Sequence, residues 1–557
     1  YMTKYIFVLG GVISGLGKGV TSGSIGAILK EMGYDKITIK KMDPYLNVDP
    51  GTLNPIEHGE VYVTNDGGET DLDLGYYERF AQIDVKKYNS TSSGKLLFDL
   101  LKKERKGEFL GKTITMIPHF TDTIKNFIYN GSDKYDIVIC EVGGSAGDYE
   151  ANAFMETIRQ IKHEKPNDVI VCLLSYLVYY QASKELKSKP TQVALRQLMS
   201  TGLKADIIFL RSEHEINESV KKKIALYGNV KKENIIPAYN VPTIYKVPLE
   251  YVKYGLIDSL KNKLGVVDKN KSTFDKWTKL NNRINNLKYK ITLGMVGKYI
   301  ELEDAYYSVN EAINHAGWYY STDVEIKYIN ARTPDNTIEQ IKQVDCVLVP
   351  GGFGTSGIDE IISAIKYCRE NLIPFMGICL GMQLSVIEFS RNILNIKNAS
   401  SSEFGKKGDE FVVDLMTEWK KDGSLEKRGK NEDLGGTLRL GSYDTVVKEG
   451  TLAHKIYEKT SFKERHRHRY EVNIKYKDRL EEKGMILSGL SPDGKLPEII
   501  EINNYFQNNK NIKHPYFIAG QFHPEFNSDP FNPHPMFKGL IKSTLKIKFK
   551  DIFDKKK

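Results

Sequence analysis

Long apolar runs and paired cysteines are missing from this 557-residue sequence. Its longest apolar stretch, residues 169–180, is shorter than the roughly 20 residues that a membrane-spanning helix needs. The apolar start at residues 5–9 breaks at Gly10, so we expect no signal peptide. The five cysteines show no CxxC spacing, and we therefore expect reduced thiols in a cytoplasmic protein without membrane contact.

A concentrated charge of one sign is also missing. The 80 basic and 71 acidic residues are scattered and leave a formal net charge of +9. The densest basic run, residues 465–469, lacks the companion clusters that a nucleic-acid-binding surface would show. The balance therefore favours small anionic substrates over nucleic acid. The length allows about three to four domains, or fewer if they are large α/β domains.

The clearest chemical motif is GICLGMQ at residues 377–383. It follows an apolar run, residues 373–376, that predicts a buried strand, and a helix-compatible segment comes after it. A nucleophile on such a turn needs small neighbours, which Gly377 and Gly381 supply. At a helix N-terminus the partial positive charge favours thiolate, so we expect Cys379 to stand exposed as a nucleophile.

Two later features could complete a catalytic site around this cysteine. His523 and Glu525 follow the apolar run at residues 516–519, and their alternation lets both side chains face one site, with His523 as base. Residues 347–354 predict a strand that enters a glycine-rich turn, whose N–H groups could bind an oxyanion. Each feature alone is more often a core cysteine or an ordinary turn, but the three together favour catalysis.

The motifs GICLGMQ and FHPEF resemble those of the class I glutamine amidotransferases. The resemblance implies that Cys379 attacks the carboxamide of glutamine, forms a glutamyl thioester and releases ammonia. Glu403 and Arg469 match positions that bind the two charged ends of glutamine, which suits their own charges. Further positions expected to bind glutamine are Gly352, Leu380 and Gln383.

A second motif, SGLGKG at residues 14–19, lies between a predicted strand at residues 4–9 and a predicted helix at residues 20–32. Backbone N–H groups, the helix N-terminus and Lys18 would together hold phosphate groups. The loop is not a regular Walker A motif, because Gly19 stands where Ser or Thr would bind magnesium. Taken alone, it could equally be a structural turn.

Polar residues at other predicted strand ends favour a nucleotide site. Lys40 and Lys41 follow the strand-like residues 37–39, and Glu141 ends another predicted strand. Ligands of a doubly wound sheet gather at the carboxyl ends of its strands. The acidic run at residues 66–75 would usually be a solvated loop, but beside a phosphate loop it becomes a candidate for binding Mg²⁺.

With KMDPYLNVDPG, HGEVYV, DLDLGYYERF, GDYE, KPTQ and KIALYGNV in this order, the chain from residue 2 to residue 545 resembles the CTP synthase family. The resemblance implies two doubly wound α/β domains: a P-loop-like synthetase domain at 1–265 and a triad glutamine amidotransferase domain at 290–545. Residues 266–289 would link them, and residues 546–557 would form a basic tail.

The family resemblance also implies an activity. ATP would phosphorylate O4 of UTP, giving a 4-phosphoryl-UTP intermediate, and ammonia channelled from Cys379 would displace the phosphate to give CTP. CTP would inhibit the enzyme, and GTP would activate it through Phe353, Arg428, Leu110 and Gly111. A homotetramer that can assemble into filaments is expected. His58 would gate the ammonia route, and residues 433–441 would form a lid.

Residue roles follow from the positions that match the family. Those expected to bind ATP are Gly15, Leu16, Gly17, Lys18, Gly19 and Val20 at the phosphates and Arg211 at the adenine. Asp73 and Glu141 would bind Mg²⁺, and Lys41, rather than Lys40, would stabilise phosphoryl transfer. Those expected to bind UTP are Ser14, Asp148, Glu150, Lys187, Lys189, Thr191, Gln192 and Lys223. The sequence departs from the family pattern at Tyr149, Tyr179, Ser188 and Tyr239, which bears on nucleotide affinity.

Two alternatives stay open from the sequence. Another P-loop amidoligase, such as a corrinoid-type amidase, would share the phosphate loop and the triad but not the segment at residues 187–192. A filament-forming structural protein would carry the same active sites incidentally. An assay for product formation distinguishes both from a CTP-forming enzyme.

Overall fold

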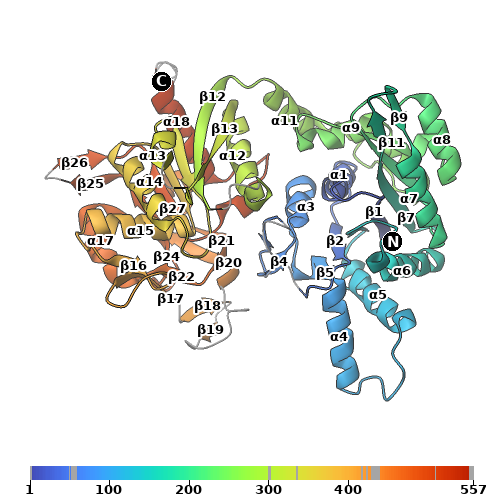
Figure 1. Ribbon diagram of the computed structural model, residues 1–557, viewed down its shortest axis with the longest axis horizontal. Coiled ribbons are helices and arrows are strands. Elements are labelled where there is room, and N and C mark those ends of the chain that lie inside the picture. The colour runs from blue at the N-terminus through green and yellow to red at the C-terminus, as the bar shows by residue number, and fades with distance from the viewer. Residues whose placement is uncertain are drawn as a thin grey trace. The chain divides into compact units, whose positions relative to one another are not determined.

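The computed structural model describes residues 3–48, 51, 59–298, 303–333, 336–415, 418–421, 424–427, 439–507 and 510–550. The chain divides into two compact units (Figure 1). Unit 1 comprises Tyr1–Leu53 and Glu69–Asn282, and unit 2 comprises Asn54–Gly68 and Arg283–Lys557. Among the described helices, none combines the length and the apolar character that crossing a membrane requires.

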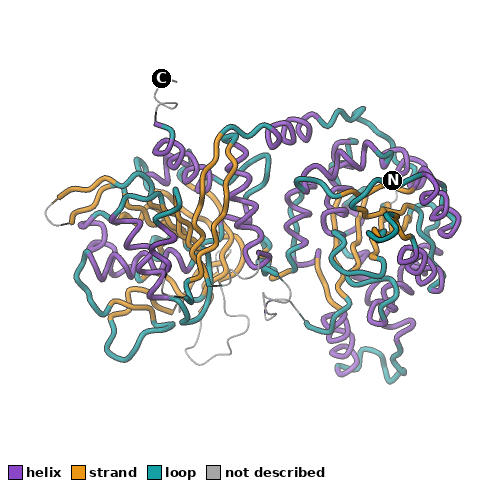
Figure 2. The backbone as a smooth tube through the Cα atoms, turned by 45° about the horizontal axis from the view of Figure 1, so that its top comes forward, coloured by secondary structure: helices purple, strands orange, loops and turns teal. Residues whose placement is uncertain are grey.

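Unit 1 contains a seven-stranded parallel sheet with the order β11-β10-β7-β1-β6-β2-β5. Its strands are β1 Lys4–Gly10, β2 Ile37–Asp43, β5 Ser90–Ser92, β6 Ile137–Val142, β7 Val169–Tyr176, β10 Ile207–Ser212 and β11 Ile235–Tyr239. Helices cover both faces of this sheet, and every residue of β6, including the charged Glu141, is buried (Figure 2). The shorter strands are β3 Tyr62–Val63, which belongs to unit 2, and in unit 1 β4 Glu69–Thr70, β8 Val178–Tyr180 and β9 Glu185–Lys187.

The helices of unit 1 alternate with these strands, as expected of a doubly wound fold. They are α1 Lys18–Glu31, α3 Asp73–Ala81, α4 Ser93–Arg105, α5 Thr121–Tyr129, α6 Asn152–Glu164, α7 Lys189–Ser200, α8 Glu218–Gly228, α9 Val247–Lys253, α10 Leu256–Leu264 and α11 Asp275–Asn285. Helix α1 packs closely on α3 because its contact face carries glycine. A Cβ atom at Gly26 would lie 2.8 Å from the Cβ of Ala81.

The segment expected to link the domains is largely ordered on unit 1. Helix α11 buries Trp277, whose ring lies 5.8 Å from that of Phe80. The side chain of Asn281 donates to the carbonyl oxygen of Tyr245 at 3.0 Å. These contacts explain why unit 1 extends to Asn282, beyond the expected boundary at residue 265.

Unit 2 contains a nine-stranded mixed sheet with the order β13-β12-β14-β15-β27-β24-β23-β20-β21. The first five strands in this order are parallel, and the remaining four are antiparallel. They are β12 Tyr289–Gly297, β13 Thr322–Asn330, β14 Cys346–Val349, β15 Phe375–Ile378, β20 Arg439–Val447, β21 Ser461–His468, β23 Met485–Leu490, β24 Pro497–Ile502 and β27 Phe517–Gly520. The other strands are β16 Ala399–Ser401, β17 Glu410–Leu415, β18 Glu418–Lys421, β19 Ser424–Lys427, β22 Tyr470–Val472, β25 Asn504–Gln507 and β26 Lys510–Lys513.

Helices cover both faces of this sheet as well (Figure 2). They are α12 Tyr307–Tyr319, α13 Thr337–Ile341, α14 Ile358–Glu370, α15 Leu380–Asn392, α16 Leu452–Tyr457, α17 Lys477–Lys483 and α18 Pro535–Lys548. Successive residues of a strand point to opposite faces, so Phe375 and Met376 of β15 enter two different hydrophobic cores. Helix α18 includes the start of the expected basic tail, and residues 551–557 lie outside the described part of the chain.

Candidate active sites

The turn after β15 has the geometry of a nucleophile elbow. Cys379 has φ 51° and ψ −100°, a conformation that L-residues rarely adopt, and it is the residue immediately before α15. A Cβ atom at Gly377 would lie 2.8 Å from the carbonyl carbon of Gly381, and one at Gly381 would lie 2.5 Å from the carbonyl oxygen of Val349. Neither position has room for a side chain, so both residues must be glycine. The elbow is confirmed, but the expected exposure is wrong: Cys379 is 4% exposed, and the cavity described below lies over it.

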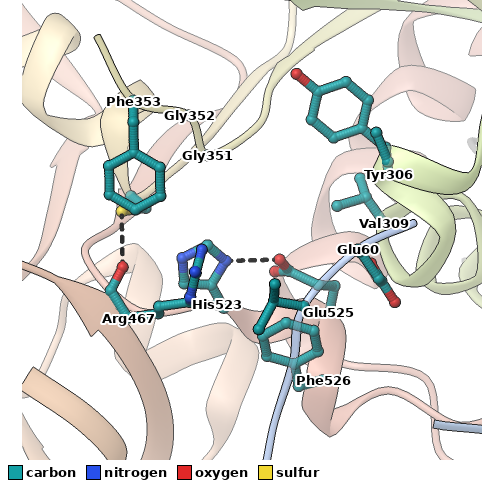
Figure 3. A pocket seen from close by; sticks show the side chains of 13 residues that line it. Glu60, Tyr306, Val309, Gly351, Gly352, Phe353, Arg467, His523, Glu525 and Phe526 are labelled. Atoms are coloured by element: carbon teal, nitrogen blue, oxygen red, sulfur yellow. Dashed lines mark hydrogen bonds and ion pairs between the residues drawn. The ribbon is translucent and has the colours of Figure 1, made fainter. Parts of the chain in front are cut away.

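His523 interacts with this thiol. Figure 3 shows His523 paired with Glu525, which orients the imidazole. Its Nδ1 atom lies 2.7 Å from Oε1 of Glu525. Burial opposes the charged imidazolium, but the Glu525 carboxylate and the Cys379 thiol outweigh burial and raise the pKa of His523 to about 10. The three side chains thus form a Cys–His–Glu arrangement in which the imidazole can accept the thiol proton.

A cavity of about 100 Å³ opens over the triad (Figure 3). Its wall includes Gly351 and Gly352 of the turn after β14, and a Cβ atom at Gly351 would lie 2.8 Å from Cε1 of His523. Gly352 approaches Leu380 closely, since its Cβ atom would lie 3.4 Å from Leu380 Cδ2. The glycine turn therefore lies beside both His523 and the side chain of Leu380, the residue after Cys379.

The remaining residues expected to bind glutamine surround the same region. Glu403 accepts a hydrogen bond from the N–H of Gly354 at 3.1 Å. Burial raises the pKa of Glu403, while Gly354, Lys298 and Arg469 lower it. The positive charge of Arg469 therefore favours the ionised form of Glu403. Gln383 lies deeper, where its side-chain amide donates to the carbonyl oxygen of Tyr470 at 2.8 Å.

Part of the cavity wall comes from early in the sequence. Glu60 and Val61 line it, although they precede the rest of unit 2 by more than two hundred residues. The carboxylate of Glu60 accepts hydrogen bonds from the backbone N–H of Ser308, at 3.0 Å, and from its hydroxyl. The sequence motif HGEVYV marked this segment, but nothing in the sequence showed that it packs on the amidotransferase unit.

In unit 1 the glycine-rich loop joins β1 to α1 as expected. Gly15 and Gly17 have φ values of 71° and 88°, which glycine adopts without strain. The ammonium group of Lys18 donates to the carbonyl oxygen of Gly144 at 2.7 Å, so it lies over the carboxyl end of the sheet. Burial lowers the pKa of Lys18, and the Glu141 carboxylate opposes that effect.

Lys41 lies inside a cluster of carboxylates next to this loop. Its Nζ atom lies 3.1 Å from Oε1 of Glu141 and 3.6 Å from Oδ1 of Asp43. It also contacts Asp73 directly, and Oδ1 of Asp71 lies 4.0 Å away. Burial favours the neutral amine, but the carboxylates outweigh it and raise the pKa of Lys41 well above 10.5.

The two neighbouring lysines point to opposite faces of β2. The Nζ atom of Lys40 donates to the carbonyl oxygens of Phe127, Ile128 and Asn130 at 2.7, 3.1 and 2.8 Å. Burial lowers the pKa of Lys40 to about 8. Lys40 therefore caps the C-terminal end of α5, whereas Lys41 faces the carboxylates.

The carboxylate cluster contains one buried oxygen atom that the sequence did not point to. Oδ2 of Asp43 is buried without a hydrogen-bond partner, and Asp43 was not among the expected ligands. Its position two residues after Lys41 on one strand was the signal that places both side chains on one face. Among the described residues, no three acidic, His or Cys side chains already form a metal cage. Mg²⁺ sites in nucleotide-binding proteins commonly combine one or two carboxylates with phosphate oxygens.

The residues expected to bind UTP lie on several segments of unit 1. Lys187, Lys189 and Lys223 are exposed, as are Ser14 and Glu150. Asp148 accepts a hydrogen bond from the N–H of Ser145 at 2.6 Å. Thr191 and Gln192 are instead buried in α7, where Thr191 donates to the carbonyl oxygen of Tyr176 at 3.0 Å. At the end of β10, Arg211 donates to Oδ1 of Asn240 at 2.8 Å.

Three expected features fall wholly or mostly outside the described residues. They are His58, Arg428 and the greater part of the segment 433–441. Of the expected GTP positions, Phe353 lies in the cavity wall, and Leu110 is 90% exposed in unit 1.

Comparison with known proteins covers nearly the whole chain. The family model described as CTP synthase N-terminus matches residues 4–266, and the one described as glutamine amidotransferase class-I matches residues 301–543. A CTP synthase of Pelagibacter ubique is 49% identical over 548 residues, which cover 97% of this chain and 99% of that protein. One of Brucella anthropi is 45% identical over 547 residues, or 98% of this chain and 99% of that protein. The solved glutaminase domain of Trypanosoma brucei CTPS with bound acivicin is 32% identical, with a TM-score of 0.39, and covers 46% of this chain and 94% of that one.

Proposed function

Because the chain belongs to the CTP synthase family and is a glutamine-hydrolysing ligase, we propose that it aminates UTP through a 4-phosphoryl-UTP intermediate. The observation that supports the glutamine half most strongly is the strained Cys379 beside the ion-paired His523 and Glu525. The carboxylate cluster around Lys41, next to the Lys18 loop, supports the phosphoryl-transfer half.

In the glutamine half, His523 takes the thiol proton to form an imidazolium–thiolate pair, and the Cys379 thiolate then attacks the carboxamide carbon. The developing oxyanion is bound by backbone N–H groups at Gly352 and Leu380. His523 then donates its proton to the leaving nitrogen, so that neutral ammonia departs and a glutamyl thioester remains. Water, deprotonated by His523, hydrolyses the thioester to glutamate. Glu525 holds the imidazole in the tautomer that each transfer needs.

In the synthetase half, the glycine-rich loop and Lys18 bind the ATP phosphates. A ring carbonyl oxygen is a poor leaving group and phosphate is a good one, so phosphorylation of O4 prepares the ring for ammonia. Asp73 and Glu141 would hold Mg²⁺, which would supply charge neutralisation at the phosphates. Lys41 would stabilise the transferred phosphoryl group.

Substrate and effector contacts complete the proposal. UTP contacts the exposed side chains of Lys187, Lys189 and Lys223. CTP binds an overlapping site as an inhibitor, and GTP binds near Phe353 as an activator. Ammonia travels to the synthetase site by an enclosed route, because ammonium in bulk water is not a nucleophile. A tetramer is proposed, as is a cytoplasmic location, which is supported by the free thiols of all five cysteines.

The test compares two nitrogen donors. The protein is mixed with UTP, ATP and Mg²⁺, together with either glutamine or an ammonium salt, and CTP is measured by the change in absorbance. We expect CTP with both donors, and none when UTP or ATP is omitted. The absence of CTP with both donors would reject the proposal, and polymer that pellets without any product would favour a structural protein.

A further inference from the structure

Arg465 of β21 is hydrogen-bonded to the segment at residues 62–65, which comes early in the chain but belongs to unit 2. Its Nε atom donates to Oδ1 of Asn65 at 2.8 Å, and one terminal nitrogen donates to the hydroxyl of Tyr62 and to the carbonyl oxygen of Val63, both at 3.0 Å. Arg465 is 4% exposed and Tyr62 is 1% exposed. A buried guanidinium needs such acceptors, so the position of Arg465 depends on the position of this segment.

The backbone of the same residue holds the catalytic histidine. The N–H of His523 donates to the carbonyl oxygen of Arg465 at 2.8 Å. A second connection runs through aromatic rings, because Tyr62 lies edge-on to Phe526 at 4.9 Å between centroids and Phe526 stacks on His523 at 5.6 Å. The segment at residues 62–65 is therefore connected to His523 through Arg465 and through Phe526. Neither connection involves the residues expected to bind glutamine.

The segment is fixed at its far end as well. The N–H of Ser442 donates to the carbonyl oxygen of Asn65 at 2.8 Å. Gly67, with φ 78°, leaves no room for a side chain, since its Cβ atom would lie 2.8 Å from the carbonyl oxygen of Leu440. A displacement of the segment would therefore be transmitted to strands β20 and β21 and not absorbed by a loose loop.

A few residues further along the chain, the same stretch enters unit 1 at Glu69. Asp71 and Asp73 follow, and both interact with Lys41 in the carboxylate cluster. Binding of a cation and phosphates would change the partners of these two aspartates. Asp71 and Asn65 lie close together in the sequence. A shift of Asp71 would therefore displace the residues that are hydrogen-bonded to Arg465.

We propose that Arg465 is a positioning residue that couples the synthetase carboxylates to His523 through the segment at residues 62–71. Glutamine hydrolysis should accordingly respond to nucleotide binding by way of the Arg465 hydrogen bonds. This inference deepens the proposed function and rests on it for the identity of the nucleotides.

The experiment measures glutamate release from glutamine with and without UTP, ATP and Mg²⁺ in the full-length protein. The variants are Arg465→Lys, Asn65→Ala and Tyr62→Phe, which remove individual hydrogen bonds and keep most of the packing. We expect the stimulation ratio to fall about fivefold to tenfold in each, the range of a typical coupling between sites. The KM for glutamine should stay close to wild type, because Glu403 and Arg469 are untouched.

Arg391→Lys serves as the matched control. Arg391 also belongs to unit 2 and donates from Nε to the carbonyl oxygen of Ala399 at 2.8 Å, away from His523. It should keep the wild-type ratio, and CTP formation from ammonium should stay close to wild type in all four variants.

Stimulation that persists in all three test variants would overturn the inference, as would a wild-type ratio of one. Equal losses of stimulation in Arg391→Lys would indicate a general structural effect and overturn it too. Failure of the proposed function is seen separately, as absence of CTP from wild-type protein supplied with ammonium, while the glutamate ratio still tests Arg465.

Discussion

The side chain of Asp73 occupies the space that even a methyl group at position 19, now Gly19, would need. A Cβ atom at position 19 would lie 2.2 Å from Oδ1 of Asp73, which is itself in contact with Lys41. The missing Walker A hydroxyl is thus explained, because the position is occupied by a carboxylate from α3. An aspartate from another segment here stands where the Ser or Thr side chain of a Walker A motif would lie.

Gly19→Ala should therefore displace Asp73 and weaken phosphoryl transfer. We expect CTP formation to fall sharply with either nitrogen donor, with a loss of about 1–3 kcal/mol in the free energy of unfolding from overpacking. Glutamate release without nucleotides should be unchanged. Ser22→Ala on the same helix is the control, since its buried hydroxyl has no hydrogen-bond partner and its removal should be neutral. Full synthetase activity in Gly19→Ala would contradict the role of Asp73.

Comparing Lys41→Met with Lys40→Met should show that the two adjacent lysines have different functions. Lys41→Met leaves buried carboxylates without their cation, which costs about 3–5 kcal/mol in the free energy of unfolding. We expect loss of CTP formation, and partial recovery of stability when Mg²⁺ is added. Lys40→Met should also destabilise the protein, because three carbonyl oxygens lose a donor, but it should keep synthetase activity. Urea unfolding with and without Mg²⁺ provides the measurement, and equal activity loss in both variants would argue against the assignment.

Cys379→Ala should abolish the use of glutamine and leave the use of ammonium. In the proposed mechanism the thiol forms the covalent intermediate, so we expect CTP formation from glutamine to fall by more than about a thousandfold. CTP formation from an ammonium salt should remain close to wild type. Cys368→Ala, a buried core cysteine of the same unit, should retain both activities at reduced stability. Loss of both activities in Cys379→Ala would refute the division of labour between the units.

Glu525→Gln should make stability depend less on pH. The pKa of His523 is raised from 6.5 to about 10, so its charge stabilises the folded protein fully below pH 6.5, and this contribution is lost as the pH rises through about 10. We expect Glu525→Gln to lower the free energy of unfolding at pH 7 by on the order of 2 kcal/mol. The difference from wild type should shrink above pH 10.

Urea unfolding of wild type and variant across this pH range tests the prediction. Glu410→Gln is the control, because its contact with Arg479 at 3.4 Å is solvent-exposed and contributes little. A difference that stays constant from pH 7 to pH 11 would exclude the His523 charge as its cause.

That Cys379, His523 and Glu525 lie together could be predicted from the sequence because their local patterns are strong. Strand, glycine-flanked cysteine and helix place Cys379, and the single residue between His523 and Glu525 orients both side chains. The exposure of Cys379 could not be predicted, because the cavity wall over it comes partly from Glu60 and Val61, far away in the sequence. Local patterns carry no information about such long-range packing.

The carboxylate cluster shows the same limit within unit 1. Lys41, Asp73 and Glu141 were expected together because strand ends meet at one edge of a parallel sheet. Asp43 and Tyr77 were missed, although the hydroxyl of Tyr77 donates to Glu141. Tyr77 lies on α3, and which face of that helix meets the sheet depends on the glycines of α1, a contact that periodicity does not reveal.

The placement of residues 59–68 in unit 2 limits how the gene can be divided. A fragment starting at Arg283 would lack Glu60 and Val61, so its thiol cavity would be open to solvent on one side and Arg465 would lose its acceptors. A fragment ending at Asn282 would carry a stretch of buried residues with nothing to cover them. No single cut in the chain separates the two units, because unit 2 takes residues from both sides of unit 1's longer segment.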